Sequence, residues 1–155
     1  MDKNSLSQKL ENQNIEGFDI LVSPPAPAGN YVAVKIVNKL AYVSGQMPIL
    51  SSGVALTKNE SDTIEFGYMA SKLAMANALK QLIYCTDIEE ICCIVRIDGY
   101  FNNRKGNDLA KMLDGASDLI SNILGKDGAH ARTVFGVDSI PYNAFVEIVV
   151  IAEIK

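Results

Sequence analysis

Apolar side chains recur at helical spacing in two long segments of this chain. In residues 62–84 they fall at every third or fourth position, and in 107–124 they form a continuous stripe that Gly125 ends. This period is that of a helix with one face against a core, and glycine is favoured just after a helix. The pattern therefore predicts helices over both segments, the first beginning with a capping box made by Asp62 and Glu65.

Runs rich in β-branched and aromatic residues lie on either side of these helices. Two of them, 31–37 and 40–45, are separated only by Asn38 and Lys39, and a two-residue break of this kind is typical of a β-hairpin. The other runs predict three further strands, at 91–101, 131–138 and 144–154.

The N-terminal part carries weaker signals. Two leucines one turn apart favour a short helix within 3–15, and three prolines in 22–30 remove backbone donors and favour an extended connection. No repeat, linker or low-complexity tract divides the sequence, so we expect a single domain over residues 1–155.

The element order β-β-α-β-α-β-β predicts an α+β fold with both helices on one face of a mixed sheet. The last strand is apolar on both sides, so the face without helices also needs cover. Self-association through the sheet is the simplest cover. On that strand Phe145, Glu147, Val149 and Ile151 share one face, and Val146, Ile148 and Val150 share the other.

A glutamate stands in the middle of this strand, in the apolar run AFVEIVVIA. Because both faces are apolar, Glu147 cannot leave the interior by turning over, and a buried carboxylate must be paired, protonated or used. Arg132, 15 residues earlier, is the candidate partner. Arginine can hold a ligand carboxylate through two parallel hydrogen bonds, and an apolar environment raises a carboxylate's pKa towards the range of acid–base catalysis. A structural ion pair and a working site both remain open.

Other polar residues add candidates for ligand binding. Tyr31, Ser44 and Gln46 could orient a small polar ligand, and Gly45 allows close backbone approach. Ser44 lies in no G-x-S-x-G motif, which argues against an acyl-transfer nucleophile. His130 is the single histidine and falls in a predicted loop, where an exposed or structural role is the simpler interpretation. No cluster with metal-ligand spacing and no phosphate-binding loop is present, so we expect no metal.

Composition narrows the function classes. The net charge of −4 argues against strong capture of nucleic acid or an anionic membrane, and no apolar run has the length of a membrane helix. The three cysteines include no C-x-x-C pair, so we expect all three to be small buried residues in a reducing compartment. The N-terminus lacks the apolar segment of a secretory signal. We therefore expect a cytoplasmic protein.

Several stretches together resemble the Rid family (YjgF type, reactive-intermediate deaminases, older label L-PSP endoribonuclease). The resemblance covers roughly residues 20–155 and includes two spacings. Tyr31 lies 13 residues before Ser44 of the SGQ motif, and Arg132 lies 15 residues before Glu147. The stretches are NYVAV, YVSGQMPI, IVRIDGYF, LDGASDLI and HARTVFGVDSIPYNAFVEIVVIA.

This resemblance implies a chorismate-mutase-like fold, assembled as a homotrimer around an inner β-barrel, with ligand sites in the clefts between subunits. The better-understood members of the family hydrolyse 2-imino acids, released as enamines, to 2-keto acids and ammonia without metal or cofactor. By resemblance, Arg132 would hold the substrate carboxylate and Glu147 would position or activate water. Tyr31, Ser44 and Gly45 would line the pocket. Two alternatives remain open: a non-catalytic trimer that binds a small carboxylate or carbonyl ligand, and, ranked last, an endoribonuclease.

The sequence also departs from the family pattern. Val134 stands where the deaminases have a cysteine, and Asp114 stands where they have an asparagine. The connection 102–108 is longer than in compact members, and residues 1–20 form an N-terminal extension. Asp114 places a second negative charge near the expected carboxylate site. The chain therefore resembles a divergent branch of the family, whose substrate can differ from a 2-imino acid.

Overall fold

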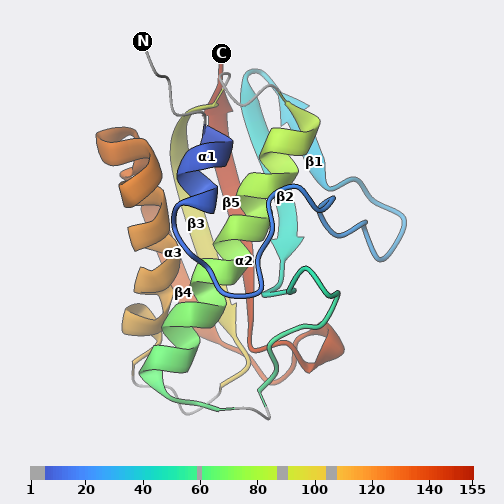
Figure 1. Ribbon diagram of the computed structural model, residues 1–155, viewed down its shortest axis with the longest axis vertical. Helices are drawn as coiled ribbons and strands as arrows, with labels where there is room; N and C mark the ends of the chain where they lie inside the picture. The colour runs from blue at the N-terminus through green and yellow to red at the C-terminus, as the bar shows by residue number, and fades with distance from the viewer. Residues whose placement is uncertain (1–5, 59–60, 87–90, 104–107) are drawn as a thin grey trace.

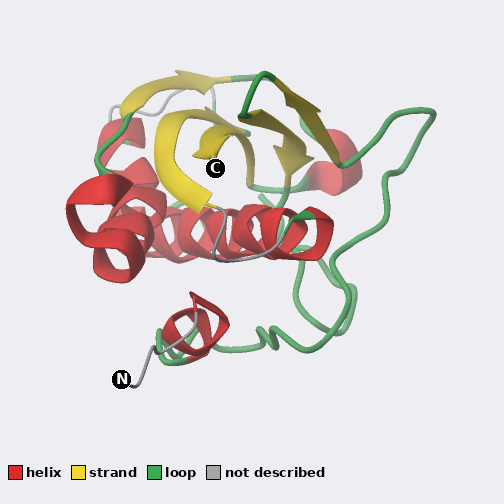
Figure 2. Cartoon of the chain, turned by 90° about the horizontal axis from the view of Figure 1, so that it is seen from above, coloured by secondary structure: helices red, strands yellow, loops and turns green. Residues whose placement is uncertain are grey.

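Five strands form one mixed sheet with two long helices on one of its faces, within the residues that the computed structural model describes, 6–58, 61–86, 91–103 and 108–155 (Figures 1 and 2). The predicted order of elements and the α+β class are confirmed. In chain order the elements are α1 (Leu6–Glu11), β1 (Val34–Val37), β2 (Leu40–Gln46), α2 (Ile64–Cys85), β3 (Ile91–Phe101), α3 (Leu109–Leu124), the 3-10 turn η2 (Gly125–Gly128), β4 (Ala131–Gly136), the 3-10 turn η3 (Pro141–Asn143) and β5 (Val146–Ile154).

The predicted hairpin joins β1 and β2. Val37 pairs with Leu40, and the two residues between them, Asn38 and Lys39, have φ angles of 50° and 66°. Two consecutive positive φ angles match the turn that suits the twist of a two-residue hairpin. The first strand begins at Val34, later than predicted.

The last strand of the chain lies at the centre of the sheet. The strand order is β1-β2-β5-β3-β4, with β5 antiparallel to both β2 and β3. The edge strand β4 runs parallel to β3, because α3 carries the chain back across the sheet between them. Strand β3 therefore separates Arg132, on β4, from Glu147, on β5.

Helices α2 and α3 pack side by side against one face of the sheet and enclose the core. Figure 2 shows all strands on one side of this helix layer. Phe145 anchors the end of the core, with edge-to-face contacts to Phe66 and Phe101 at centroid distances of 5.1 and 5.9 Å. Each fully buried large apolar side chain stabilises the fold by about 1.5–3 kcal/mol. The core includes Leu73, Leu79, Leu82, Leu113, Leu119, Ile120, Ile148 and Val150.

The start of α2 differs from the prediction. The N-cap is Thr63, whose Oγ1 accepts a hydrogen bond from the Phe66 backbone N–H at 3.2 Å. The predicted capping box of Asp62 and Glu65 is wrong by one residue, because threonine is itself a good N-cap and Thr63 has the extended backbone that a cap requires. At the other end of the helical pair, α3 stops at Leu124 before Gly125, as predicted.

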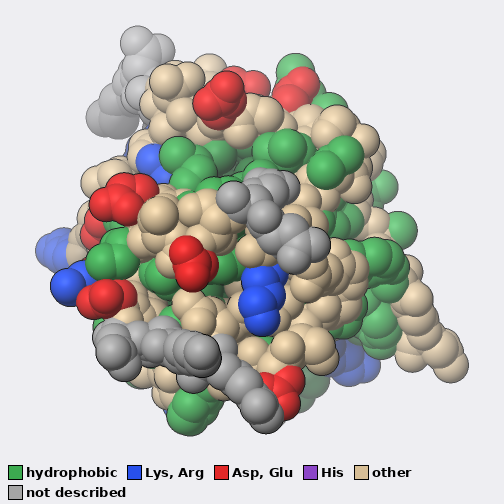
Figure 3. Space-filling model, turned by 90° about the horizontal axis from the view of Figure 1, so that it is seen from below, with side chains coloured by type: hydrophobic (Ala, Val, Ile, Leu, Met, Phe, Trp, Pro, Cys, Tyr) green, Lys and Arg blue, Asp and Glu red, His purple; other side chains and the backbone are tan. Residues whose placement is uncertain are grey.

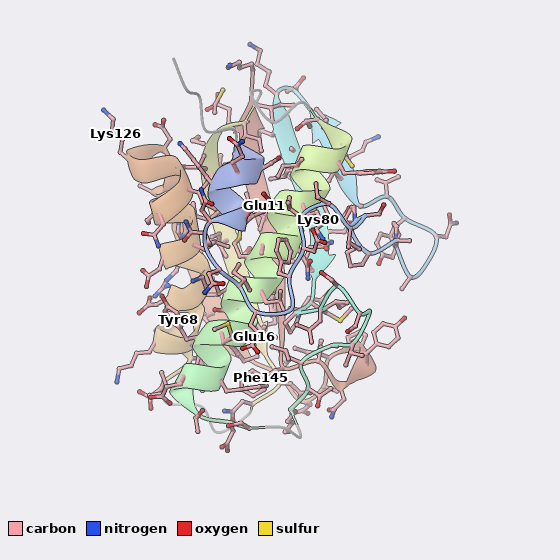
Figure 4. The ribbon with its side chains drawn as sticks, viewed as in Figure 1. Glu11, Glu16, Tyr68, Lys80, Lys126 and Phe145 are labelled. Atoms are coloured by element: carbon pink, nitrogen blue, oxygen red, sulfur yellow. The ribbon has the colours of Figure 1, made fainter. Side chains whose placement is uncertain are left out.

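The N-terminal segment packs on the outer side of the helix layer (Figures 1 and 2). The observed helix α1 is shorter than the predicted segment 3–15, and residues 1–5 lie outside the described part of the chain. The Lys80 ammonium, labelled on α2 in Figure 4, donates to the Asp19 carbonyl at 2.7 Å and lies 4.4 Å from the centre of the Phe18 ring. Burial lowers the pKa of Lys80. This lysine therefore fastens the segment after α1 to α2.

The sheet face away from the helices carries exposed apolar side chains, and no helix among the described residues covers it. Tyr42, Val95 and Phe135 are each more than two-fifths exposed, and Val149 and Ile151 are half-buried. The prediction of a final strand with two apolar faces is therefore confirmed, except that Phe145, assigned to the same face as Glu147, precedes β5 and packs against Phe66 in the core. Covering this face by self-association remains a proposal.

The cysteines do not behave as predicted. Cys85 is exposed, and Cys92 and Cys93 are half-exposed. Cys85 is the last residue of α2, where the helix leaves the core. The adjacent pair lies where the β3–β5 register shifts, so regular alternation between buried and exposed faces is lost.

Candidate functional site

Glu147 is a half-buried carboxylate on the sheet face away from the helices. Desolvation by burial raises the pKa of Glu147 above its ordinary value. Among the described residues, no donor is hydrogen-bonded to this carboxylate. A desolvated carboxylate that accepts no hydrogen bond is poorly stabilised as an anion, so it binds a proton more readily and can act as a base or an acid.

Gly45 makes room for this carboxylate. It lies in a break in the β2–β5 register between Val43 and Gln46, and a Cβ atom at position 45 would overlap the Glu147 side chain. Glycine is therefore required by close approach rather than by its φ angle. The sequence predicted a close approach at this glycine but not its partner.

Tyr31 and Gly45 line a cavity of about 470 Å³ beside β2. Tyr31 is 51% exposed, and its hydroxyl accepts a hydrogen bond from the Ala28 N–H at 3.1 Å. Ser44 does not line the cavity, and its hydroxyl donates to the Val32 carbonyl at 2.7 Å. The predicted roles of Tyr31 and Gly45 in a pocket are thus compatible with their positions. The Ser44 side chain is instead hydrogen-bonded to the backbone outside the cavity.

Gln81 and Tyr142 also line this cavity and were not singled out from the sequence. Gln81 is buried on α2, where its Nε2 donates to the Pro25 carbonyl at 2.7 Å and fixes the proline-rich connection. Tyr142 has a φ of 60° within η3, which turns the chain towards the cavity. No sequence signal marks either residue, because helix α2 and the turn reach the cavity only in the folded chain.

Arg132 lies on the other side of the sheet and contacts α3. Its Nη1 is 2.8 Å from Asp114 Oδ1 and donates to Ser117 Oγ at 3.0 Å, and its Nη2 donates to the Ala110 carbonyl at 3.3 Å. The Arg132 side chain is 29% exposed and that of Asp114 is 48% exposed. The Asp114 carboxylate therefore lies beside Arg132, whereas a ligand-carboxylate site at this position stays a prediction.

His130 supports the same cluster. Its Nδ1 lies 2.6 Å from the Gly128 carbonyl, which can only accept, so Nδ1 carries a proton. In the neutral imidazole, Nε2 then accepts from the Ser117 hydroxyl at 2.9 Å. His130 is therefore part-buried and hydrogen-bonded, and through Ser117 it helps to position Arg132. Sequence reasoning missed Ser117, because one serine on a helix carries no distinguishing signal.

Arg132 and Glu147 face opposite sides of the sheet within one chain. Arg132 is in register with Ile97, which is buried under the helices, whereas Glu147 is in register with Tyr100 on the other face. The alternative of a structural ion pair between Arg132 and Glu147 within one chain is therefore wrong. The candidate site consists of two halves. In the Glu147 half, Gly45 lies against Glu147 and shares a cavity with Tyr31, and the Arg132 half comprises Arg132, Asp114, Ser117 and His130.

Comparison with known proteins identifies the family of this chain. Residues 16–154 match a family model described as "YjgF/chorismate_mutase-like, putative endoribonuclease". The chain belongs to the YjgF family. The resemblance to the Rid (YjgF-type) proteins is therefore confirmed.

Three known proteins match this chain over 87% or more of its length. A protein from Shewanella oneidensis, described as a "putative endoribonuclease", shares 32% identity with a TM-score of 0.84 over 97% of this chain and 99% of its own. Atu1372 of Agrobacterium tumefaciens, described as being of unknown function, shares 29% identity with a TM-score of 0.80 over 97% and 92%. Protein TCP17 of Trypanosoma cruzi is 29% identical over 87% of this chain and 88% of its own.

Two features are absent within the described residues. No group of three or more His, Cys, Asp or Glu side chains there could hold a metal ion. No helix there is long and apolar enough to cross a membrane.

Proposed function

We propose that this YjgF-family protein hydrolyses 2-imino acids, and their enamine tautomers, to 2-keto acids and ammonia without a cofactor. The observation that supports this most directly is the Glu147 carboxylate, which is half-buried, has a raised pKa and accepts no hydrogen bond from the described residues. Such a group can take a proton from water and return it within one turnover.

Arg132 retains enough donors to hold a carboxylate. A guanidinium has five N–H groups. Among the described residues, Arg132 donates from Nη1 to Ser117 Oγ and from Nη2 to the Ala110 carbonyl, and its Nη1 lies 2.8 Å from Asp114 Oδ1. The Nε–H and one Nη2–H have no partner among these residues, which is the number that a two-pronged grip on a substrate carboxylate needs. The contact with Asp114 therefore does not prevent Arg132 from acting as the carboxylate anchor.

The reaction balances with these two residues and water. Ionised Glu147 takes a proton from water as the water oxygen bonds to the imine carbon, and the C=N electron pair moves to nitrogen, which receives that proton from Glu147. Glu147 then takes the hydroxyl proton and passes it to the amino nitrogen, the C–N bond breaks with its electron pair on nitrogen as the C=O bond forms, and ammonia leaves with Glu147 ionised again. Arg132 holds the neighbouring carboxylate and keeps the imine carbon within reach of the water.

The two halves can meet only if different copies of the chain supply them. Glu147 and Arg132 face opposite sides of the sheet, and the open face of the sheet is apolar. We propose a homotrimer in which the Glu147 half of one copy meets the Arg132 half of the next. Light scattering at micromolar concentration should give about three times 16.8 kDa. A stable monomer or dimer would contradict this assembly.

Binding without turnover is the second candidate. It is favoured by Val134, which stands where the family's deaminases have a cysteine, and by Ser44, whose hydroxyl donates to the backbone. In this case the same cleft would hold a small carboxylate or carbonyl ligand. The ribonuclease activity ranks last because the net charge is −4, and basic side chains on the face in Figure 3 lie among acidic ones without forming a broad patch. We expect only weak RNA binding at physiological salt.

A mixing experiment tests both the reaction and the shared site. Ammonia release is measured with imino acids generated in situ, for wild type and for Glu147→Gln and Arg132→Lys. Each variant alone should be impaired. Co-expressed together, they should regain about a quarter of the wild-type rate, because random assembly gives that share of clefts with both residues intact. No regain would contradict a site between copies, and no ammonia release by wild type beside clear keto-acid binding would favour the second candidate.

A further inference from the structure

Asp114 gives the Arg132 half an unusual charge balance. Its Oδ1 lies 2.8 Å from Arg132 Nη1, and no described residue is hydrogen-bonded to its Oδ2. Among the described residues, two N–H groups of Arg132 and one oxygen of Asp114 therefore have no partner, and the pair has no net charge. Resting on the proposed function, we propose that Asp114 makes this site selective for zwitterionic ligands, which carry a protonated nitrogen next to the carboxylate, over 2-keto acids.

Ligand chemistry is compatible with this pair of charges. The carboxylate of an α-amino or α-iminio acid can bind the two remaining N–H groups of Arg132. When the nitrogen of such a ligand lies towards Asp114, the Asp114 carboxylate attracts its positive charge and can accept an N–H. A 2-keto acid has an oxygen in place of that nitrogen, and its lone pairs would face the Asp114 carboxylate. An unpaired acceptor facing an anion rejects the wrong ligand as effectively as a good contact attracts the right one.

The net charge of the occupied site also favours a zwitterion over a keto acid. A zwitterion adds no charge to the neutral pair, whereas a keto acid adds one negative charge beside Asp114. Hydrolysis of an imino acid replaces the nitrogen by oxygen, so the same carboxylate that favours the substrate disfavours the product. Asp114 would thereby promote release of the keto acid after each turnover.

The surrounding contacts keep the site in place when Asp114 is changed. Ser117, on the next turn of α3, still accepts from Arg132 at 3.0 Å, and His130 fixes the Ser117 hydroxyl from the other side at 2.9 Å. The Ala110 carbonyl holds Nη2. Asp114→Asn therefore removes a charge and one strong acceptor without freeing the Arg132 side chain.

Asp118 offers a matched control. It lies one turn further along α3, and its Oδ2 accepts a hydrogen bond at 2.7 Å from the hydroxyl of Tyr68, the α2 residue that Figure 4 labels. No contact joins Asp118 to Arg132 among the described residues. Asp118→Asn changes the net charge by the same amount as Asp114→Asn and leaves the acceptor beside Arg132 unchanged.

Calorimetric titration with L-alanine and pyruvate tests the proposal, because the two ligands differ chiefly at the nitrogen. Wild type should bind L-alanine more tightly than pyruvate. In Asp114→Asn the ratio of the two dissociation constants should shift towards pyruvate by about fivefold or more, a modest value for a partly exposed group. Asp118→Asn should keep the wild-type ratio, and all three proteins should melt within a few degrees of one another.

Three outcomes would overturn the selectivity. They are an unchanged ratio in Asp114→Asn, an equal shift in Asp118→Asn, which would show bulk charge alone, and no binding of either ligand to wild type at tens of millimolar. Ammonia release is measured separately. Normal turnover with an unchanged ratio contradicts only the role of Asp114, whereas a shifted ratio without any turnover contradicts only the proposed hydrolysis.

Discussion

The two halves of the candidate site differ in how their charges are satisfied. Arg132 is surrounded by acceptors on α3: it donates to Ser117 Oγ and to the Ala110 carbonyl, and its Nη1 lies 2.8 Å from Asp114 Oδ1. Glu147, on β5, has a raised pKa and no donor among the described residues. The first arrangement fixes a side chain in one orientation, which suits an anchor. The second leaves a proton acceptor unstabilised, which suits a base.

The strongest test of this difference is Glu147→Gln. The substitution keeps the shape and removes the base, so any hydrolysis should fall by roughly 10²–10⁴-fold while ligand binding is retained. Because no hydrogen bond is lost and a half-buried charge is removed, the melting temperature should stay or rise. A sharp loss of stability with unchanged turnover would show that Glu147 is structural.

Arg132→Lys tests the anchor. Lysine keeps the charge but loses the planar fork, so ligand affinity should fall by about 1.5–3 kcal/mol, the value of a hydrogen bond to a charged group. Unlike Glu147→Gln, this change also removes contacts with Ser117 and Ala110, and a lower melting temperature should accompany it. Titration calorimetry and thermal unfolding measure the two effects. Unaltered affinity would remove Arg132 from the site.

Gly45→Ala tests the space around Glu147. The added methyl group would overlap the carboxylate, so the side chain or strand β2 must move. We expect a loss of about 1–3 kcal/mol in the free energy of unfolding, typical of overpacking, together with reduced turnover. In the Glu147→Ala background the same glycine substitution should cost much less, since the obstructing atoms are gone. Equal costs in the two backgrounds would contradict the contact.

The smallest effect is the pH dependence of stability. A carboxyl whose pKa is raised on folding holds its proton more tightly in the folded than in the unfolded chain. Its favourable contribution is therefore present at pH below its ordinary value of 4.5 and is lost as the pH rises through the higher folded pKa. Relative to Glu147→Gln, wild type should lose stability between about pH 4.5 and neutrality, whereas turnover should rise over the same interval as the base ionises. A constant stability difference across this range would contradict the raised pKa.

Much of the fold could be predicted from the sequence because its signals are local. The helical period of the two apolar stripes, the alternation along the strands and the Asn38-Lys39 turn depend on neighbouring residues only, and the structure contains each of them. The errors arose where competing local choices have similar energies. Thr63 rather than Asp62 caps α2, and register shifts in β3 expose the adjacent cysteines.

For the candidate site, too, part could be predicted from the sequence and part depends on the tertiary structure. By itself the sequence determined which residue types stand at positions 31, 44, 45, 114, 132 and 147, and the two spacings that placed the chain in its family. Only the tertiary structure decided that Arg132 turns towards Asp114 and away from Glu147. Which face of a sheet a side chain takes depends on strand order and register, and these are set by pairing between segments distant in the chain. The contacts of Ser117 and His130 likewise exist only because α3 packs across β4, so no local pattern in the sequence records them.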